Sequence, residues 1–136
     1  MLCVVRGALS TLAQTLGFQE QECHAVVLAV DEALTNIIRH AYKGKNERPI
    51  AASFRRIQVS ENGSNRAALE ILLEDHGVTV DPKELCGRPL EDVRPGGLGL
   101  HFIRESMDRV QFHRRNGRNQ LRLVKFIRDS KPQTSC

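Results

Sequence analysis

Three short segments of the chain combine residue types whose spacing could support chemistry on a phosphorylated ligand. The first is VDEALTNIIRHAYKG, residues 30–44, where Glu32, Asn36 and His40 recur at every fourth position. On a helix such residues are neighbours, about 5–6 Å apart between Cβ atoms. An amide oxygen suits Mg²⁺, and Glu32 could accept a proton from a nucleophile. The alternative is a solvated helix edge on which His40 is merely structural.

The other two segments are EDHGV, residues 74–78, and RPGGLGLHF, residues 94–102. Asp75 could accept a hydrogen bond from an exocyclic amine, and Gly77 would let a ligand or backbone approach closely. Glycines just before a helix leave its first N–H groups free to face an anion. The alternatives are a simple turn at the strand end and a flexible joint at the loop end. Neither the P-loop pattern nor the dinucleotide fingerprint is present.

These segments need helices and strands that hold them in place. Apolar periodicity and turn residues predict helices over 4–16, 20–42 and 98–108, and strands over 50–60, 66–76, 109–115 and 118–127. The side chains expected to face inward are Val26, Val30, Ala33, Leu34, Ile37, Ala41, Leu69, Ile71, Leu73, Leu100, Ile103 and Met107. Residues 78–97 have no sustained periodicity, and a loop of this length is often a lid or binding segment.

The order of these elements indicates an α+β fold. Hairpin strands with grouped helices predict a two-layer α/β sandwich, in which a mixed, mostly antiparallel sheet carries about three helices on one face. One domain over residues 1–128 accounts for the pattern, and residues 129–136 are expected to form a disordered tail.

Composition narrows the classes of function. The 136 residues are 40% hydrophobic, lack tryptophan and carry a formal net charge of +4. No C-x-x-C occurs among the cysteines, at 3, 23, 86 and 136, so free buried thiols are expected rather than a zinc site. The apolar start has no signal-peptide pattern and is too short to span a bilayer, which predicts a cytoplasmic protein without membrane contact.

A basic hairpin leaves nucleic-acid binding as an alternative. Its cations are Arg109, Arg114, Arg115, Arg118, Arg122 and Lys125. Stacking aromatics are scarce between them, so a solvated basic face without direct nucleic-acid contact is the better interpretation.

The order of the three motifs resembles the ATP-binding domain of gyrase-type topoisomerases, heat-shock chaperone ATPases, sensor histidine kinases and mismatch-repair ATPases. More narrowly, LAVDEALTNIIRHAYKG, EDHGVTVDP and PGGLGLHFIRESMDRV are similar to segments of the bacterial anti-sigma-factor serine kinases. The resemblance covers nearly the whole chain.

This resemblance implies ATP and Mg²⁺ as cofactors and assigns a role to each matching residue. Glu32 matches the general base, Asn36 the Mg²⁺ ligand, and Asp75 with Gly77 the site that recognises the adenine amino group. The segment that meets the phosphates would be Gly97, Leu98, Gly99 and Leu100. Residues 80–95 would form the ATP lid, from which Arg94 could reach the terminal phosphate.

The function implied is phosphoryl transfer to a serine or threonine of an anti-anti-sigma (STAS-type) partner, with sequestration of a sigma factor as the second activity. A homodimer is also compatible with the resemblance. The alternatives are a non-catalytic nucleotide-binding module that acts by protein contact, and the catalytic half of a sensor histidine kinase.

Three features depart from the family pattern. The first helix starts almost at Met1, where the family has a strand that can help to pair subunits. Thr79 replaces a glycine of the first glycine box, and the final strand, QLRLVKF, lacks the threonine that many relatives place near the adenine.

Overall fold

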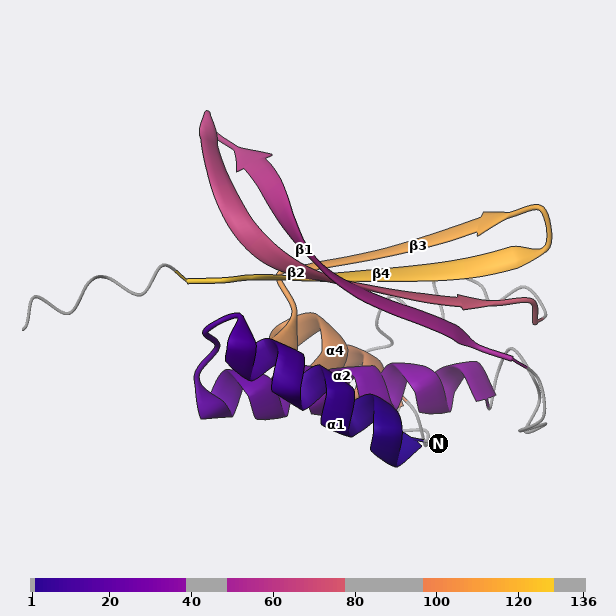
Figure 1. Ribbon diagram of the computed structural model, residues 1–136. Helices are drawn as coiled ribbons and strands as arrows, with labels where there is room; N and C mark the ends of the chain where they lie inside the picture. The colour runs from indigo at the N-terminus through magenta and orange to yellow at the C-terminus, as the bar shows by residue number, and fades with distance from the viewer. Residues whose placement is uncertain (1, 39–48, 78–96, 129–136) are drawn as a thin grey trace, which may run out of the picture.

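The computed structural model describes residues 2–38, 49–77 and 97–128, which form three helices and four strands (Figure 1). The elements are α1 Leu2–Thr15, α2 Glu20–Asn36, β1 Ala51–Glu61, β2 Ser64–Asp75, α4 Gly97–Ser106, β3 Arg109–Arg115 and β4 Arg118–Phe126. All three helices lie on one face of the sheet, so the predicted two-layer α+β sandwich is confirmed.

The sheet has the strand order β1-β2-β4-β3, and each of these neighbouring pairs is antiparallel. Both predicted hairpins are present, and both turn on an Asn-Gly pair. Positive φ angles at Asn62 and Gly63, 50° and 78°, and at Asn116 and Gly117, 54° and 73°, suit the tight turns that join twisted antiparallel strands. These turns fix the register within each hairpin.

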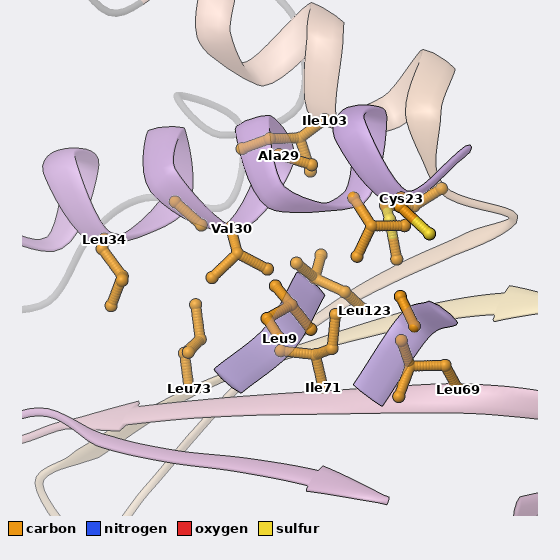
Figure 2. Close-up of a cluster of buried hydrophobic side chains, with 14 of the residues drawn as sticks. Leu9, Cys23, Ala29, Val30, Leu34, Leu69, Ile71, Leu73, Ile103 and Leu123 are labelled. Atoms are coloured by element: carbon orange, nitrogen blue, oxygen red, sulfur yellow. The ribbon is translucent and has the colours of Figure 1, made fainter. Parts of the chain in front are cut away.

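The core fills the space between the helices and one face of β2 and β4. Leu69, Ile71 and Leu73 of β2 and Leu123 of β4 are completely buried there, beneath α2 (Figure 2). The buried stripe expected on α2 is confirmed for Val26, Val30, Ala33, Leu34 and Ile37, and Ile103 and Met107 are buried as well. Ala41 lies outside the described residues, and the side chain of Leu100 is likewise not described.

One row of residues crosses three neighbouring strands on the helix side of the sheet. Asp75, the last residue of β2, is paired with Asn119 of β4, and Asn119 is paired with Arg114 of β3. Directly opposed residues in antiparallel strands point to the same face. The row therefore begins in the EDHGV segment, residues 74–78, and ends on the basic hairpin.

The opposite face of the sheet holds a carboxylate that alternation alone would leave in water. Glu70 is only 3% exposed because Arg55 and Arg122 lie over it from the two neighbouring strands. Arg122 Nε donates to Glu70 Oε2 at 2.7 Å, and Arg55 donates to Oε1. Burial raises the pKa of Glu70, but the hydrogen bonds from the two arginines outweigh it, so the pKa is lowered from its ordinary value.

Beside this ion pair the same face carries a small apolar patch. Its members are Ile57, Val59, Ala68, Val124 and Phe126. The guanidinium groups of Arg66 and Arg109 lie 4.4 and 5.5 Å from the centroid of the Phe126 ring, within the range of a cation–π contact. Arginine side chains therefore cover part of this apolar patch.

The expectation of buried thiols is right for Cys23 and wrong for Cys3. Cys23 lies on the buried side of α2, and its Sγ lies 3.5 Å from the carbonyl of Phe18. Cys3 is exposed because it stands two residues, or about 200°, before Val5 on α1, away from the apolar stripe. Cys86 and Cys136 lie outside the described residues.

None of the helices in the described ranges is long and apolar enough to cross a membrane.

Candidate functional site

Asn36 is the last residue of α2 and lies on its buried side, not on a solvated edge. Its side chain is 5% exposed, and neither its Oδ1 nor its Nδ2 has a hydrogen-bond partner within the described residues. Buried polar groups in proteins are usually paired, and an unpaired one costs roughly 1–3 kcal/mol. Among the described residues the fold thus leaves this buried amide without a partner, so its oxygen and nitrogen could serve a ligand.

Glu32 lies one turn before Asn36 on α2 and is half-buried. The helix packs through Ala33 and Leu34, so Glu32 stands at the border between that packed stripe and solvent. After Asn36 the helix widens into a π turn at Ile37 and Ile38, a local form that is frequent at functional sites. The structure therefore gives the carboxylate and the amide the shared side that their spacing predicts.

Asp75 sits at the other end of the expected site and is fixed by two donors. The backbone N–H of Gly77 donates to Asp75 Oδ1 at 2.8 Å, and Asn119 Nδ2 donates to the same oxygen at 2.9 Å. The first contact forms an Asx turn, in which an aspartate side chain accepts a hydrogen bond from the backbone N–H two residues later. Asp75 and Asn119 are 3% and 1% exposed. The carboxylate is therefore held in one orientation before any ligand arrives.

Arg114 completes this network from the edge strand. Its Nη1 donates to Asn119 Oδ1 at 2.7 Å and to the carbonyl of Gly77 at 3.1 Å. Gly77 is consequently fixed at both of its backbone groups, the N–H by Asp75 and the carbonyl by Arg114. Asn119 Nδ2 also lies 3.5 Å from that carbonyl.

The first turn of α4 faces the same end of the molecule. Figure 1 shows α4 running back alongside α2, opposite to it in direction, and Figure 2 places Ile103 of α4 against Ala29 of α2. At 1.5 Å per residue, the start of α4, Gly97–Leu100, then lies level with the end of α2. The ends of α2 and β2 and the β3–β4 turn point the same way in Figure 1.

The structure thus joins Asp75 and Gly77 directly, and brings Glu32, Asn36 and the backbone of Gly97–Leu100 to the same end. No hydrogen bond or ion pair within the described ranges links the two groups directly. The other expected site residues, His40, Arg94 and the lid over 80–95, lie outside the described residues, as does Thr79.

Two residues of the network were not recognised in the sequence. The final strand lacks the expected threonine, but Asn119 stands beside Asp75 instead. Arg114 is exposed, as the interpretation of a solvated basic face expects, but that interpretation did not include the contacts that its Nη1 makes with Gly77 and Asn119. The Asn116-Gly117 turn does predict that 114 faces 119. The pairing of β4 with β2, which brings both to Asp75, has no local signal.

The basic hairpin is moreover divided between the two faces of the sheet. The strand registers put Arg114 and Lys125 on the helix side and Arg109, Arg115, Arg118 and Arg122 on the other side. On the helix side, Lys125 Nζ donates to the carbonyl of Ser106 at the end of α4. On the outer side, Arg118 pairs with Glu74 at 3.5 Å and Arg122 with Glu70.

Residues 2–125 match the model of the family described as the histidine kinase-like ATPase domain. The chain belongs to this family.

Its similarity extends to individual serine kinases. It is 30% identical over 137 residues to the serine-protein kinase RsbW of Listeria innocua, which covers 96% of this chain and 83% of that protein. It is also 30% identical over 134 residues to the serine-protein kinases RsbW of Bacillus thuringiensis and Bacillus cereus, covering 93% of this chain and 78% of theirs. The resemblance stated from the sequence is confirmed, and the kinship supports a kinase.

Proposed function

We propose that this protein is an ATP-dependent serine/threonine kinase that phosphorylates an anti-anti-sigma (STAS-type) partner and sequesters a sigma factor. The observation that carries the proposal is the buried amide of Asn36, which has no hydrogen-bond partner in the part of the chain that the structure describes and lies one turn beyond the half-buried carboxylate of Glu32. The similarity to serine-protein kinases supports the choice of a hydroxyl acceptor.

The donor set fits Mg²⁺. Asn36 offers a neutral amide oxygen, and Mg²⁺ commonly takes one or two protein ligands while keeping waters and phosphate oxygens. Bound there with ATP, the metal would neutralise charge on the phosphates. The unpaired state of both Asn36 amide atoms is what an absent ligand would leave behind.

Each remaining part of the site has a role toward ATP. Asp75 would accept a hydrogen bond from the adenine amino group, beside Gly77. The first N–H groups of α4, from Gly97 to Leu100, would hold phosphate oxygens, because the start of a helix favours negative charge. Arg94 and the lid over 80–95 are proposed from the resemblance alone.

Glu32 would orient the acceptor hydroxyl and take its proton. The serine or threonine oxygen bonds to the γ-phosphorus while the bond from that phosphorus to the bridging oxygen breaks, and ADP leaves. Positioning and charge neutralisation carry most of such catalysis, and a placed base contributes about 10²–10⁴-fold.

Transfer of label from γ-labelled ATP to the cognate anti-anti-sigma protein tests the proposal. We expect Glu32→Gln to lower the rate of transfer by about 10²–10⁴-fold while the affinity for ATP stays unchanged. Glu20→Gln, an exposed position in the first turn of the same helix, is the matched control and should leave transfer intact.

Two other outcomes decide between the alternatives. ATP binding without any transfer of label would favour the non-catalytic regulatory module. Transfer to a histidine rather than to a serine or threonine would favour the catalytic half of a sensor histidine kinase. Sequestration is tested separately, by co-purification of the sigma factor with the ATP-bound protein.

A further inference from the structure

We propose that Arg114 is a positioning residue for base recognition: acting through Asn119, it aims the Asp75 carboxylate and thereby sets a preference for adenine over 6-oxo purines. The inference rests on the proposed function, since it concerns the nucleotide site built around Asp75. Arg114 reaches Asp75 through two hydrogen bonds, one that it donates to Asn119 Oδ1 and one that Asn119 Nδ2 donates to Asp75 Oδ1.

The first step is the geometry at Arg114. Each terminal nitrogen of a guanidinium carries two hydrogens and no acceptor. Arg114 Nη1 has two acceptors in reach, Asn119 Oδ1 at 2.7 Å and the Gly77 carbonyl at 3.1 Å. One nitrogen of Arg114 on β3 therefore bonds both to the Asn119 side chain on β4 and to Gly77, which follows β2 and lies 37 residues before Arg114.

The second step is the orientation of the Asn119 amide. A guanidinium can only donate and an ionised carboxylate can only accept. The amide lies between Arg114 and Asp75, so its oxygen must face the arginine and its nitrogen must face the aspartate. The reversed amide would set a donor against the guanidinium and an oxygen against the carboxylate. Arg114 and Asp75 thus favour the same orientation of the Asn119 amide, with its Nδ2 toward Asp75.

The third step is the state of the carboxylate. The Gly77 N–H and Asn119 Nδ2 both end on Asp75 Oδ1, and within the described residues no donor occupies Oδ2. A buried carboxylate held in this way keeps one oxygen as an acceptor. Adenine offers an amino group at its 6-position, whereas hypoxanthine and guanine place a carbonyl oxygen there. An oxygen facing Oδ2 leaves both groups unpaired, which disfavours those bases.

Without Arg114, Asn119 Oδ1 loses a charged donor and the Gly77 carbonyl loses its anchor. Asp75 would then no longer be fixed with Oδ2 toward the base. The expected consequence is a loss of discrimination between bases. A general weakening of the fold would instead lower the affinity for every nucleotide alike, and this difference separates positioning from a purely structural role.

The test measures dissociation constants of the full chain for Mg-ATP and for Mg-ITP, which differ at the 6-position of the base. Variants are Arg114→Leu, Arg114→Lys and the control Arg115→Leu. Arg115 is the next residue on β3, points to the opposite face and carries the same charge. Thermal unfolding without nucleotide verifies that each variant is folded, and Arg114→Lys serves if the leucine variant is not.

We expect wild type and Arg115→Leu to prefer ATP, and Arg114→Leu to lower that preference by roughly tenfold or more, the equivalent of one charge-assisted hydrogen bond. Arg114→Lys keeps the charge on a shorter side chain and should lie between them. An unchanged preference in Arg114→Leu, or an equal loss for both nucleotides, overturns the inference and leaves the proposed function standing. Absence of ATP binding by the wild type overturns both.

Discussion

Asn119 and Asp75 stand directly opposite one another on β4 and β2, and Asn119 Nδ2 donates to Asp75 Oδ1 at 2.9 Å across 44 residues of sequence. Both side chains are almost fully buried. A carboxylate enclosed in this way is costly unless it is well paired. The last strand of the sheet therefore supplies the support for a residue that belongs to a motif much earlier in the chain.

This pairing predicts the effect of Asp75→Asn. Because the Gly77 N–H and Asn119 both donate to Oδ1, the new amide must keep its oxygen there and put its NH₂ in the place of Oδ2. ATP affinity should fall by about 10–100-fold, as for a lost hydrogen bond to a charged group, while ITP affinity rises relative to it. Titration calorimetry with both nucleotides measures this. Glu74→Gln, on the opposite face, is the control, and unchanged ATP affinity in Asp75→Asn would contradict the role of Asp75.

Asn36→Ala should abolish most of the stabilisation by Mg-ATP. A ligand at 100 times its dissociation constant raises the free energy of unfolding by about 2.7 kcal/mol, which thermal unfolding detects easily. Without nucleotide the variant should be as stable as the wild type or more so, because an unpaired buried amide has been removed. Thr35→Ala, the preceding residue, is the control. A full Mg-ATP shift in Asn36→Ala would refute the proposed metal ligand.

Glu70→Gln should destabilise the protein in a manner that depends on pH. Since the pKa of Glu70 is lowered in the folded protein, its ionised form adds stability above the ordinary value of 4.5, and this is lost as the pH falls through the lowered pKa. We expect a deficit of roughly 1–2 kcal/mol near pH 7, narrowing in acid. Urea unfolding between pH 3 and pH 7, at roughly one-unit steps, measures it.

The control for that prediction is Glu61→Gln. Glu61 is 40% exposed, and its carboxylate lies 3.7 Å from Arg66 Nη1. An exposed pair of this kind contributes about 0–1 kcal/mol. Equal losses at the two positions, or a Glu70→Gln deficit that does not change with pH, would show that the two arginines do not act through the charge.

Cys3 and Cys23 should differ sharply in their reaction with iodoacetamide. Cys3 is exposed, whereas burial raises the pKa of the Cys23 thiol and keeps it protonated. We expect rapid modification of Cys3 in the native protein and modification of Cys23 only in denaturant. Mass spectrometry of peptides gives the rate at each site. Comparable native rates would mean that the core around Cys23 is packed more loosely than the structure shows.

Local sequence patterns predicted most of the fold. The alternation at Leu69, Ile71 and Leu73 and the helical spacing at Val26 and Val30 identified the buried faces correctly, because burial of apolar area decides which face turns inward. The Asn-Gly pairs located both turns, since few residue types accept the backbone angles that these turns need. These signals lie within a few residues of the structure they determine.

Local sequence patterns identified the residues of the site less completely than the fold. Glu32, Asn36 and Asp75 were found because each stands in a short motif, and their roles toward ATP stay predictions. Asn119 and Arg114 reach Asp75 only through the pairing of β2 with β4, which joins residues more than 40 positions apart. The burial of Glu70 has no local signal for a related reason: the arginines that cover it come from two other strands.

The arginines over Phe126 determine how fast the exposure of this ring can change on the face of the sheet opposite the helices. Their side chains end in solvent, with Arg66 43% exposed, and exposed side chains change rotamer within picoseconds to nanoseconds. The aromatic ring can thus be uncovered and covered again without the opening of a single backbone hydrogen bond. The surface around Phe126 therefore alternates between a charged state, with the ring covered, and an apolar state, with the ring exposed. This exchange is faster than the diffusion of a partner protein to the sheet.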